Sequence, residues 1–437
     1  MELFGTDGIR GKFGGELLNL DSIKKLGLAA GKVFSGKKCL IGRDTRESGE
    51  IIEKELLKNL TSQNVSVGML GIIPTPGVAY LVKKLGYDFG IIISASHNPF
   101  TDNGIKFVDS NGFKLSSEME REIENEYLTD DFKDNEKGNV EKLNNNVNDY
   151  LDFLKEQGLD LSGLKIVLDC ANGAAYEIAP KIFKELGAEV IVLNNKPDGK
   201  NINESCGAVH PELIINDVIV QQADLGITLD GDADRLMLID DKGKVIDGDY
   251  ILAIAGKYLN EKGLLKNSTV VSTVMANFGL GKCFESLGIN LIKTKVGDKY
   301  VVREMKDHDY ILGGEQSGHI IFSNLLNSGD GTLSALQILK VIKESGKSLS
   351  ELSSILTKYP QVLINVKVRE KKNLQDVPIV MDKIEEVEQK ISGDGRVLVR
   401  YSGTENLLRV MVEYKDESLV SNYAQEIVDV VKTELGE

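Results

Sequence analysis

Residues 164–193 read LKIVLDCANGAAYEIAPKIFKELGAEVIVL, and the order of patterns in this stretch decides the fold. An apolar run leads through a polar turn at Ala-Asn-Gly into an amphipathic segment that ends at Leu-Gly, and a second apolar run follows. Glycine just after the last helical turn is a frequent helix terminator. A strand, a helix and a strand in this order predict two parallel strands joined by a right-handed crossover.

Two other segments repeat this order. Residues 37–70 read KKCLIGRDTRESGEIIEKELLKNLTSQNVSVGML, and residues 268–294 read STVVSTVMANFGLGKCFESLGINLIKT, with the same Leu-Gly stop. Three such units on a chain of this length predict three related α/β domains rather than one large sheet. The alternative is that βαβ units simply look alike.

The remaining segments differ from this pattern. From about residue 118 to residue 148 the chain is acidic, rich in Asn and poor in large apolar residues, which predicts a surface connection between two domains. Beyond Pro360 a strand, a helix, two strands and a final amphipathic helix predict a smaller α+β domain.

Composition excludes several classes of protein. A hydrophobic share of 41% and a charged share of 27% are ordinary for a globular protein. No apolar run is long enough for a membrane span, and the N-terminus does not resemble a signal peptide. The formal net charge of −15 argues against nucleic acid as a partner. The scattered cysteines Cys39, Cys170, Cys206 and Cys283 predict reduced, mostly buried thiols and a cytoplasmic protein.

Three carboxylates stand at alternate positions in TLDGDADRLMLID, namely Asp230, Asp232 and Asp234. If this run is extended, their side chains point to the same side and suit a hard divalent cation with oxygen ligands. The spacing does not fit an EF-hand loop, because Arg235 stands where that loop needs glycine. A solvated acidic turn is the alternative, although the flanking apolar residues favour a cation site.

Ser96 follows an apolar strand in GIIISASHNPFTDNGIKF, residues 90–107. The GxSxG elbow of a serine hydrolase is absent. A phosphoserine here would bring three acceptor oxygens and could complete the coordination of the aspartate-bound cation. The commoner role for such a serine is a turn residue before Asn-Pro. Lys106, if its pKa is lowered, could serve as general base or acid.

Three further loops carry polar groups suited to a phosphorylated sugar. In ILGGEQSGHIIF, Glu315, Ser317 and His319 alternate and form a comb of hydrogen-bonding groups for sugar hydroxyls. VRYSGTENLLRV brings arginines and hydroxyls around a glycine, which is typical of a phosphate nest, and FGTDGIRG adds another arginine. Buried polar turns are the alternative for the first two. Local positive charge is therefore available despite the acidic total.

Together these loops resemble the α-D-phosphohexomutase family across nearly the whole chain. SASHNP resembles its phosphoserine loop, DGDADR its metal loop, GGEQSGH its sugar loop and RYSGTE its phosphate loop, in the family's order. The resemblance implies an α/β protein with four domains around a central cleft, three related α/β domains and a smaller C-terminal α+β domain. We place them at 1–148, 149–249, 250–362 and 363–437.

The resemblance also implies a role for each matching residue. Ser96 matches the phosphorylated serine and Lys106 matches the general base. The other catalytic residues are His97, Arg10 and Arg235, and the two arginines flank the phosphoryl group that is transferred. The ligands of one Mg²⁺ are Ser96, Asp230, Asp232 and Asp234. Sugar-binding residues are Glu315, Ser317 and His319, and the phosphate clamp is Arg400, Ser402, Gly403, Thr404 and Arg409.

The implied activity is an intramolecular phosphoryl transfer, an isomerase reaction through a hexose 1,6-bisphosphate that also serves as activator. Within the family the sequence is most similar to the branch that interconverts glucosamine 6-phosphate and glucosamine 1-phosphate for amino-sugar nucleotide synthesis. NINESCGAVHP from Asn201 and Gln316 carry this similarity. A mutase of broader hexose specificity, a sugar phosphatase and a non-catalytic sugar-phosphate sensor are the alternatives. The resemblance leaves a homodimer open.

Overall fold

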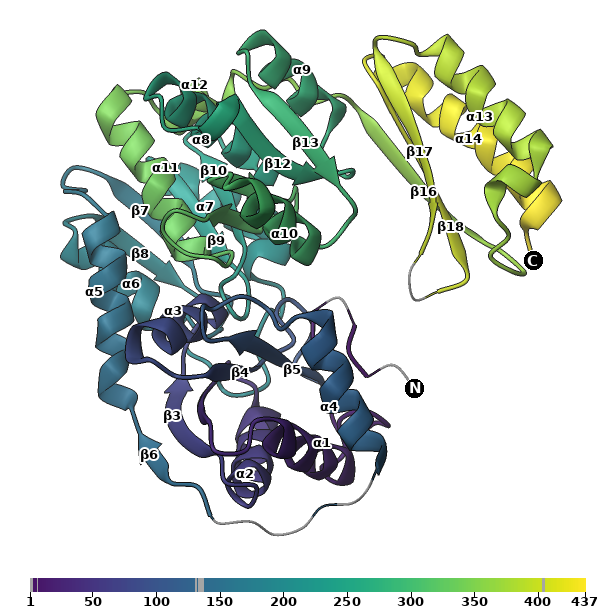
Figure 1. Ribbon diagram of the computed structural model, residues 1–437. Helices are drawn as coiled ribbons and strands as arrows, with labels where there is room; N and C mark the ends of the chain where they lie inside the picture. The colour runs from purple at the N-terminus through teal and green to yellow at the C-terminus, as the bar shows by residue number, and fades with distance from the viewer. Residues whose placement is uncertain (1–2, 6, 130–131, 133–136, 403–404) are drawn as a thin grey trace. The chain divides into compact units, whose positions relative to one another are not determined.

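The computed structural model describes residues 3–5, 7–129, 132, 137–402 and 405–437. These form two compact units (Figure 1). The first unit comprises Met1–Met275 and Gly288–Ile355, and the second comprises Ala276–Leu287 and Leu356–Glu437. The chain therefore passes into the second unit twice, first for a short helix and then for its C-terminal part.

The first unit begins with a six-stranded sheet in the order β1-β5-β4-β2-β3-β6. Strands β2, β3, β4 and β6 run parallel, whereas β5 and β1 pair antiparallel at one edge. The strands are β1 (Ile9–Lys12), β2 (Lys38–Arg43), β3 (Ser66–Ile72), β4 (Phe89–Ile93), β5 (Asp102–Asp109) and β6 (Val140–Lys142). The helices are α1 (Leu20–Val33), α2 (Glu47–Thr61), α3 (Thr75–Leu85) and α4 (Ser117–Thr129).

Helices cover both faces of this sheet. One face and helices α1, α2 and α4 share a core that includes Leu26, Leu56 and Ile123. Helix α3 packs on the other face, where Gly42 and Gly90 leave room for its valines, since a Cβ at either position would lie within 3 Å of one. The predicted surface connection from residue 118 is therefore wrong in its first part. That stretch forms α4, because Ile123 is buried in the core and Met119 and Tyr127, four residues away on the same helical face, pack against that core.

The second sheet of the first unit has five strands in the order β11-β10-β9-β7-β8. Its strands are β7 (Lys165–Asp169), β8 (Glu189–Leu193), β9 (Leu225–Leu229), β10 (Leu236–Asp240) and β11 (Val245–Ile246). Its helices are α5 (Val147–Gln157), α6 (Ile178–Glu185) and α7 (Ile215–Val220), with short 3₁₀ turns η1 (Asn144–Asn146), η2 (Gly207–Val209) and η3 (Pro211–Ile214). As the sequence predicts, β7 and β8 are parallel, and Gly187 follows α6 with a φ of 98°.

The third sheet has four strands in the order β13-β12-β14-β15. Its strands are β12 (Thr269–Thr273), β13 (Asn290–Thr294), β14 (Leu312–Gly314) and β15 (Ile320–Phe322). Its helical elements are α8 (Gly248–Glu261), η4 (Lys266–Ser268), α10 (Asp298–His308), α11 (Gly331–Ser345) and α12 (Leu349–Ser353). In all three predicted repeats, the two strands pair in parallel, which confirms the βαβ prediction.

The second unit is a three-stranded antiparallel sheet in the order β16-β18-β17 with helices on one face. Its elements are β16 (Gln361–Lys367), β17 (Gly395–Tyr401), β18 (Leu407–Tyr414), α9 (Phe278–Ser286), η5 (Leu374–Asp376), α13 (Pro378–Lys390) and α14 (Glu417–Leu435). The predicted α+β C-terminal pattern is confirmed. The cleft shared by all four domains stays a prediction.

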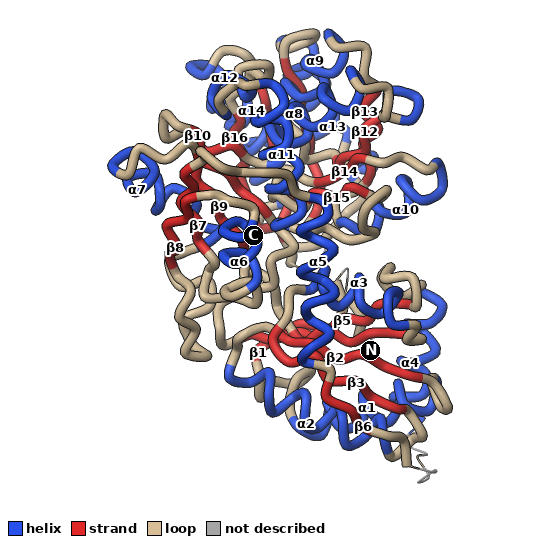
Figure 2. The backbone as a smooth tube through the Cα atoms, turned by 90° about the vertical axis from the view of Figure 1, so that its left-hand side faces the viewer, coloured by secondary structure: helices blue, strands red, loops and turns tan. Residues whose placement is uncertain are grey.

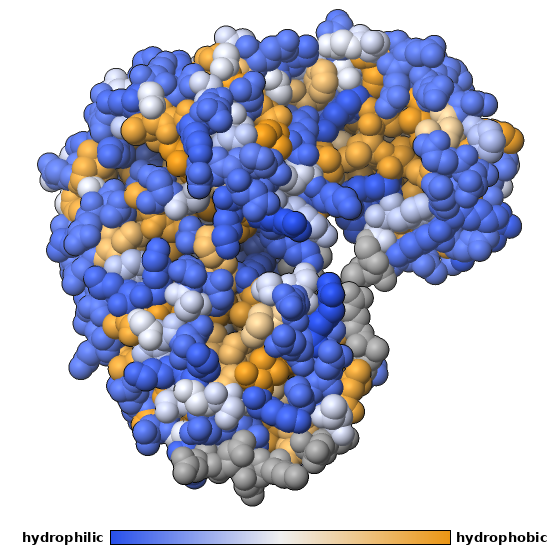
Figure 3. All heavy atoms as spheres, in the orientation of Figure 1, coloured by the Kyte–Doolittle hydropathy of each residue, from blue (hydrophilic) through white to orange (hydrophobic). Residues whose placement is uncertain are grey.

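The tube view shows the helices and strands of both units (Figure 2). The surface in view is mostly hydrophilic (Figure 3), because the large apolar side chains lie in the cores between sheets and helices. All four cysteines are free and buried, as predicted. None of the helices in the described part of the chain combines the length and the apolar character that a membrane span requires.

Candidate active site

Ser96 lies in the loop that leaves strand β4 and has an unusual backbone conformation. Its φ is 51°, a left-handed value that serine rarely adopts, and its side chain is buried. The Ser96 hydroxyl donates a hydrogen bond to Oδ2 of Asp230 over 2.6 Å. Nδ1 of His97 lies 3.3 Å from Oγ of Ser96. The serine therefore faces the acidic loop that the sequence singles out.

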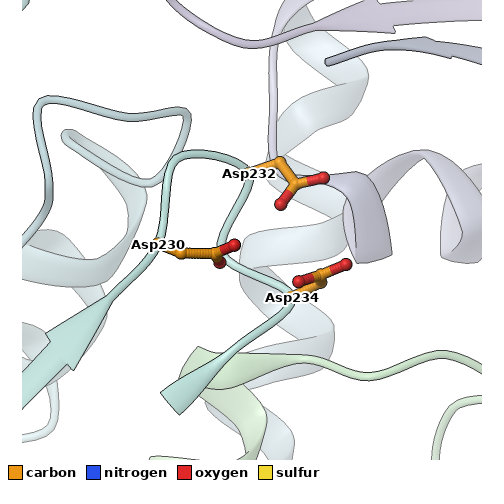
Figure 4. A group of neighbouring side chains, drawn as sticks. All are labelled: Asp230, Asp232 and Asp234. Atoms are coloured by element: carbon orange, nitrogen blue, oxygen red, sulfur yellow. The ribbon is translucent and has the colours of Figure 1, made fainter. Parts of the chain in front are cut away.

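Asp230, Asp232 and Asp234 converge, but not for the predicted reason. They lie in a tight loop between β9 and β10 rather than on an extended run, with Ala233 at a φ of 57° and its N–H donating to the Asp230 carbonyl. This turn brings the three carboxylates together (Figure 4). One oxygen from each lies within 4.8 Å of the others, and all three side chains are buried.

The carboxylates are suited to a hard cation by their free oxygens as well as their spacing. Oδ1 of Asp232 and Oδ1 of Asp234 are buried and accept no hydrogen bond among the described residues. Their other oxygens are engaged: the Thr75 hydroxyl donates to Oδ2 of Asp232 over 2.6 Å. Buried carboxylate oxygens without partners are costly unless a cation or a proton occupies them. The residues therefore fit a divalent cation with oxygen ligands.

Lys106 contradicts the prediction of a lowered pKa. Its Nζ lies 2.9 Å from Asp232, 3.0 Å from Asp7 and 3.7 Å from Asp234. Burial acts to lower the pKa of the ammonium, but these three carboxylates together raise it well above its usual range. Sequence reasoning counted neighbouring cations, whereas in the structure the carboxylates are nearer.

The aspartates differ in charge state although they share one loop. Burial and the charges of Asp234 and Asp232 raise the pKa of Asp230 to about 8. For Asp234, burial acts in the same direction but is outweighed by Lys106 and His319, which hold its pKa below the usual range. Without a cation, the site thus keeps one carboxyl protonated and one ionised, the usual response of crowded carboxylates.

The other predicted catalytic residues lie nearby. The backbone N–H of Arg235 donates to Oδ1 of Asp230 over 3.1 Å. The guanidinium of Arg10 is ion-paired with Asp7, and its Nε is buried without a hydrogen-bond partner among the described residues. Burial and the charges of Arg235 and Arg10 lower the pKa of His97 to about 4, so its imidazole is neutral near pH 7.

The predicted sugar-binding residues lie in a hairpin turn, not along a strand. The turn joins the end of β14 to the start of β15, and within it the N–H of Glu315 donates to the carbonyl of His319. The prediction of a period-two comb was therefore wrong, because the two glycines of β14 end that strand before Glu315. Ser317 is part of the same turn, and Oε1 of Glu315 accepts a hydrogen bond from the N–H of Gly297.

His319 is the member of this turn that approaches the metal loop. Its Nδ1 lies 3.6 Å from Asp234 and its Nε2 lies 3.6 Å from Asp298. Burial acts to lower the pKa of His319, but Asp234, Asp298 and Glu315 raise it to about 9. The imidazolium is therefore held between carboxylates from two loops.

Sequence reasoning missed several charged residues of this site. The ammonium of Lys114 lies 2.6 Å from Asp298 and also contacts Asp7. With Lys106 and His319, these residues line a cavity of about 570 Å³ in the first unit. Asp7 stands beside Arg10 in the quoted stretch FGTDGIRG, so its position was visible as a signal. Lys114 and Asp298 follow ordinary turns, and the sequence offers no comparable signal for them.

The predicted phosphate clamp belongs to the second unit. Arg400 on β17 and Arg409 on β18 are register partners, so their side chains lie on the same face of the sheet. Burial and the nearby Arg409 lower the pKa of Arg400. Ser402 is buried at the end of β17. Gly403 and Thr404 fall outside the described residues.

Comparison with known proteins identifies four successive matches to one family. The family described as phosphoglucomutase/phosphomannomutase matches residues 1–134 as alpha/beta/alpha domain I, 148–243 as domain II, 247–359 as domain III and 363–430 as the C-terminal domain. Curated relatives extend over the full chain. A phosphoglucosamine mutase of Brevibacillus brevis is 49% identical, with 99% of each chain covered. One of Bdellovibrio bacteriovorus is 46% identical with the same coverage.

Solved structures share the fold. A phosphoglucomutase/phosphomannomutase family protein of Burkholderia thailandensis aligns with a TM-score of 0.83 at 23% identity, covering 100% of this chain and 99% of the other. An Aspergillus fumigatus N-acetylphosphoglucosamine mutase, in complex with GlcNAc-6P and magnesium, aligns with a TM-score of 0.69 at 18% identity, covering 99% and 95%. Four family domains in order, and relatives nearly half identical over the full length, confirm the resemblance. This chain belongs to the phosphoglucomutase/phosphomannomutase family.

Proposed function

We propose that this protein is an isomerase that interconverts glucosamine 6-phosphate and glucosamine 1-phosphate by way of a phosphorylated Ser96. The observation that carries the proposal is the contact between the Ser96 hydroxyl and Asp230, at the edge of three buried carboxylates. A serine held against such a cluster is placed to carry a phosphoryl group whose negative charge a cation would neutralise. The names of relatives 46–49% identical to this chain support the choice of sugar.

In this proposal, Asp230, Asp232 and Asp234 hold one Mg²⁺ together with an oxygen of the phosphoserine. The ion supplies charge neutralisation for the phosphoryl group during transfer. The two buried Oδ1 atoms of Asp232 and Asp234 support this assignment, since they have no hydrogen-bond partner among the described residues. Magnesium is favoured over softer metals because every donor is an oxygen.

The reaction then follows from the side chains around Ser96. The phosphoserine gives its phosphoryl group to the free hydroxyl of the hexosamine phosphate, and a 1,6-bisphosphate forms. That molecule turns end for end and returns its other phosphoryl group to Ser96. The neutral His97 borders the serine, Arg10 and Arg235 lie near His97, and all three would contact the transferred group. Positioning and charge neutralisation would supply most of the rate, as is usual for phosphoryl transfer.

The role of Lys106 in this scheme depends on whether a cation is bound to the aspartates. In the structure it is an ammonium surrounded by carboxylates, which is the form of a proton donor or an electrostatic stabiliser. A cation bound to Asp232 and Asp234 would compete for the same charges and weaken that stabilisation. We infer that this competition allows Lys106 to accept the proton of the substrate hydroxyl, as the sequence predicted.

Two sets of residues would bind the substrate. Glu315, Ser317 and His319 would bind the sugar hydroxyls beside the cavity of about 570 Å³. Arg400, Ser402 and Arg409, with Gly403 and Thr404, would bind the phosphate that is not reacting. The guanidinium groups of Arg400 and Arg409 share one sheet face, which suits the fork geometry of phosphate binding.

The proposal also covers the activator, the domain limits and the partners of the protein. A hexose 1,6-bisphosphate acts as activator by phosphorylating free Ser96. The domain limits at 148, 249 and 362 are part of the proposal, and family matches at 1–134, 148–243, 247–359 and 363–430 support four domains near these limits. The net charge of −15 disfavours nucleic acid and anionic membrane surfaces as partners. A homodimer is compatible with this scheme.

The test is an isomerisation assay with Mg²⁺ and a trace of glucose 1,6-bisphosphate. Glucosamine, mannose and glucose 1-phosphates are compared at equal concentration. We expect preferred turnover of glucosamine 1-phosphate, and a loss of about 10⁴-fold or more in Ser96→Ala because the phosphoryl carrier is removed. Ser62→Ala, at the end of α2, is the matched control and should retain full activity.

The outcomes separate the candidate functions. Equal turnover of mannose or glucose would assign the protein to a mutase of broader specificity. Release of free phosphate without isomerisation would favour a phosphatase. Full activity in Ser96→Ala would refute the phosphoserine scheme itself.

A further inference from the structure

The peptide of Ser96 is fixed by side chains to which the proposed reaction gives no role. The Ser96 carbonyl accepts a hydrogen bond from Nδ2 of Asn203 over 2.9 Å and one from Nη2 of Arg46 over 3.2 Å. The Asn98 carbonyl accepts from the same two atoms, over 3.1 Å and 2.6 Å. Two donors are thus shared by two carbonyls that flank the turn after the serine.

The backbone N–H of Ser96 is held as well. The Ser96 N–H donates to the hydroxyl of Ser94 over 2.9 Å, and that hydroxyl donates to the carboxylate of Asp44. Asp44 is in turn ion-paired with Arg46, and both side chains are buried. Asp44, Ser94, Ser96 and Arg46 therefore form a closed ring of buried polar groups. Such a ring has little freedom to rearrange.

Asn203 comes to this ring from a different sheet. It lies in the loop after β8, with a φ of 57°, and its N–H donates to the carbonyl of Ala171. Gly231 also lies against the Ser96 carbonyl, because a Cβ there would lie 2.6 Å from that oxygen and 2.8 Å from Nδ2 of Asn203. The carbonyl is therefore in contact with both the loop of Asn203 and the metal loop.

We propose that Asn203 and Arg46 are positioning residues that keep Ser96 in its left-handed conformation and so aim its hydroxyl at Asp230. A serine at a φ of 51° relaxes to an ordinary conformation unless its neighbours prevent it. Relaxation would rotate Cβ and move the hydroxyl away from the carboxylates. The inference rests on the proposed function for its kinetic consequence, but its geometric part stands on these contacts alone.

Its consequence concerns the step that loads the serine. There, Ser96 Oγ bonds to phosphorus as the bond from phosphorus to the C1 or C6 oxygen of a hexose 1,6-bisphosphate breaks. The hydroxyl proton of Ser96 ends on the released sugar oxygen. A misplaced nucleophile slows this step without changing how the sugar and the distal phosphate are bound.

The test variant is Asn203→Gly, with Asn172→Gly as its matched control. Glycine removes the amide and keeps the positive φ available at both positions. Asn172 lies in the loop after β7, has a φ of 48° and donates to the carbonyl of Asn201, which lies in the loop of Asn203. It has no hydrogen bond to the Ser96 turn. Arg46 is left intact, because its removal would leave the Asp44 carboxylate buried without its counter-charge.

Dephosphorylated full-length proteins are mixed with glucose 1,6-bisphosphate and Mg²⁺, and phosphoserine is followed by intact mass after rapid quenching. We expect Asn203→Gly to load Ser96 about 10–100-fold more slowly than wild type. Asn172→Gly should stay within about twofold. Affinity for glucose 6-phosphate by calorimetry should be unchanged in both, since a positioning effect leaves binding intact. A crystal structure of Asn203→Gly should show Ser96 at a negative φ or its hydroxyl away from Asp230.

Equal loading rates in the two variants would overturn the inference, as would slow loading with the Ser96 geometry retained. Slow loading with a matching loss of sugar-phosphate affinity would mean a general disturbance of the site, which also contradicts it. Failure of the wild type to acquire phosphate on Ser96 would refute the proposed function instead. The crystal structure of Asn203→Gly would then still decide whether Asn203 holds the serine.

Discussion

The aspartate–serine centre of the first unit and the arginine pair of the second unit handle charge in different ways. In the centre, Ser96, Lys106 and three aspartates are buried and bonded to one another across loops from two sheets. In the pair, Arg400 and Arg409 lie on neighbouring strands, and like charges side by side repel. The first region is organised before any ligand arrives. In the second, burial and the nearby Arg409 lower the pKa of Arg400, and Glu405 lies 3.9 Å from Arg409.

This contrast fits the two tasks that the proposed reaction sets. Phosphoryl transfer needs fixed geometry at the reacting group, which a buried, cross-linked network supplies. Holding the distal phosphate needs positive charge and hydrogen-bond donors that suit either end of the sugar, which the partly buried guanidinium groups of Arg400 and Arg409 supply. The experiments below test whether the two regions differ in this way.

The largest effect is expected when the carboxylate cluster loses one charge. Asp232→Asn should lower the isomerisation rate about 10²–10³-fold and weaken Mg²⁺ binding measured by calorimetry, because one anionic ligand is lost. EDTA should abolish wild-type activity, and Mg²⁺ should restore it. Asp394→Asn, an exposed carboxylate of the second unit, is the control. Normal Mg²⁺ dependence in Asp232→Asn would mean that the cluster is not the metal site.

Removing one arginine of the pair should affect binding more than chemistry. Arg400→Ala should raise KM about 10–100-fold, with a smaller change in kcat, because charge-assisted phosphate contacts are lost. Arg369, which bonds the Glu434 carbonyl elsewhere in the second unit, gives the control Arg369→Ala. A fall in kcat with constant KM would place Arg400 in the chemical step and erase the contrast between the two regions.

A side chain at Gly231 should disturb the centre through packing alone. Its Cβ would lie 2.6 Å from the Ser96 carbonyl oxygen, so one backbone must move. Gly231→Ala should destabilise the first unit by about 1–3 kcal/mol and lower kcat. In Gly11→Ala the new Cβ has no atom within 4 Å, so this variant should melt as the wild type does. Equal melting temperatures for the two variants would argue against a rigid centre.

The last effect concerns stability rather than activity, namely the pH dependence of stability in the first unit. Burial raises the pKa of Asp330 to about 6, although its ordinary value is 3.8. The folded protein therefore binds this proton more tightly than the unfolded chain. The stabilising contribution is complete below pH 3.8 and is lost as the pH rises through about 6, amounting to about 2–3 kcal/mol.

Wild type should therefore gain melting temperature relative to Asp330→Asn as the pH falls from 7 to 4.5. Asp416 caps α14 as Asp330 caps α11 but is exposed in the second unit, so Asp416→Asn is the control for the loss of a helix cap. Parallel curves for wild type and Asp330→Asn would show that burial does not perturb this carboxyl.

Much of the fold was predictable because its signals are local. Apolar runs, the polar turns and the Leu-Gly stops at residues 186–187 and 287–288 specify strand, helix and strand wherever they occur. Where local signals were weak, the prediction failed. Helix α4 has few apolar residues and was taken for a linker, since its burial depends on α1, which is distant in sequence.

The candidate site was predictable as a list of residues but not as an arrangement. Asp230, Asp232 and Asp234 were found by their spacing, yet they converge through a turn at Ala233 rather than along a strand. Glu315 and His319, expected to alternate as a row of hydrogen-bonding groups, likewise lie in a hairpin turn between β14 and β15. Alternation in a sequence does not distinguish an extended run from a tight loop, because both can bring every second side chain to one side.

By itself the sequence determined the order of the strands and helices, the four polar loops and the family. These properties reside in residue types and short spacings, which are present before the chain folds. Tertiary structure alone decided the charge state of Lys106 and the confinement of Ser96 between Arg46 and Asn203. Such properties depend on distances between loops that are far apart along the chain, since electrostatic energies and hydrogen bonds are set by separation in space.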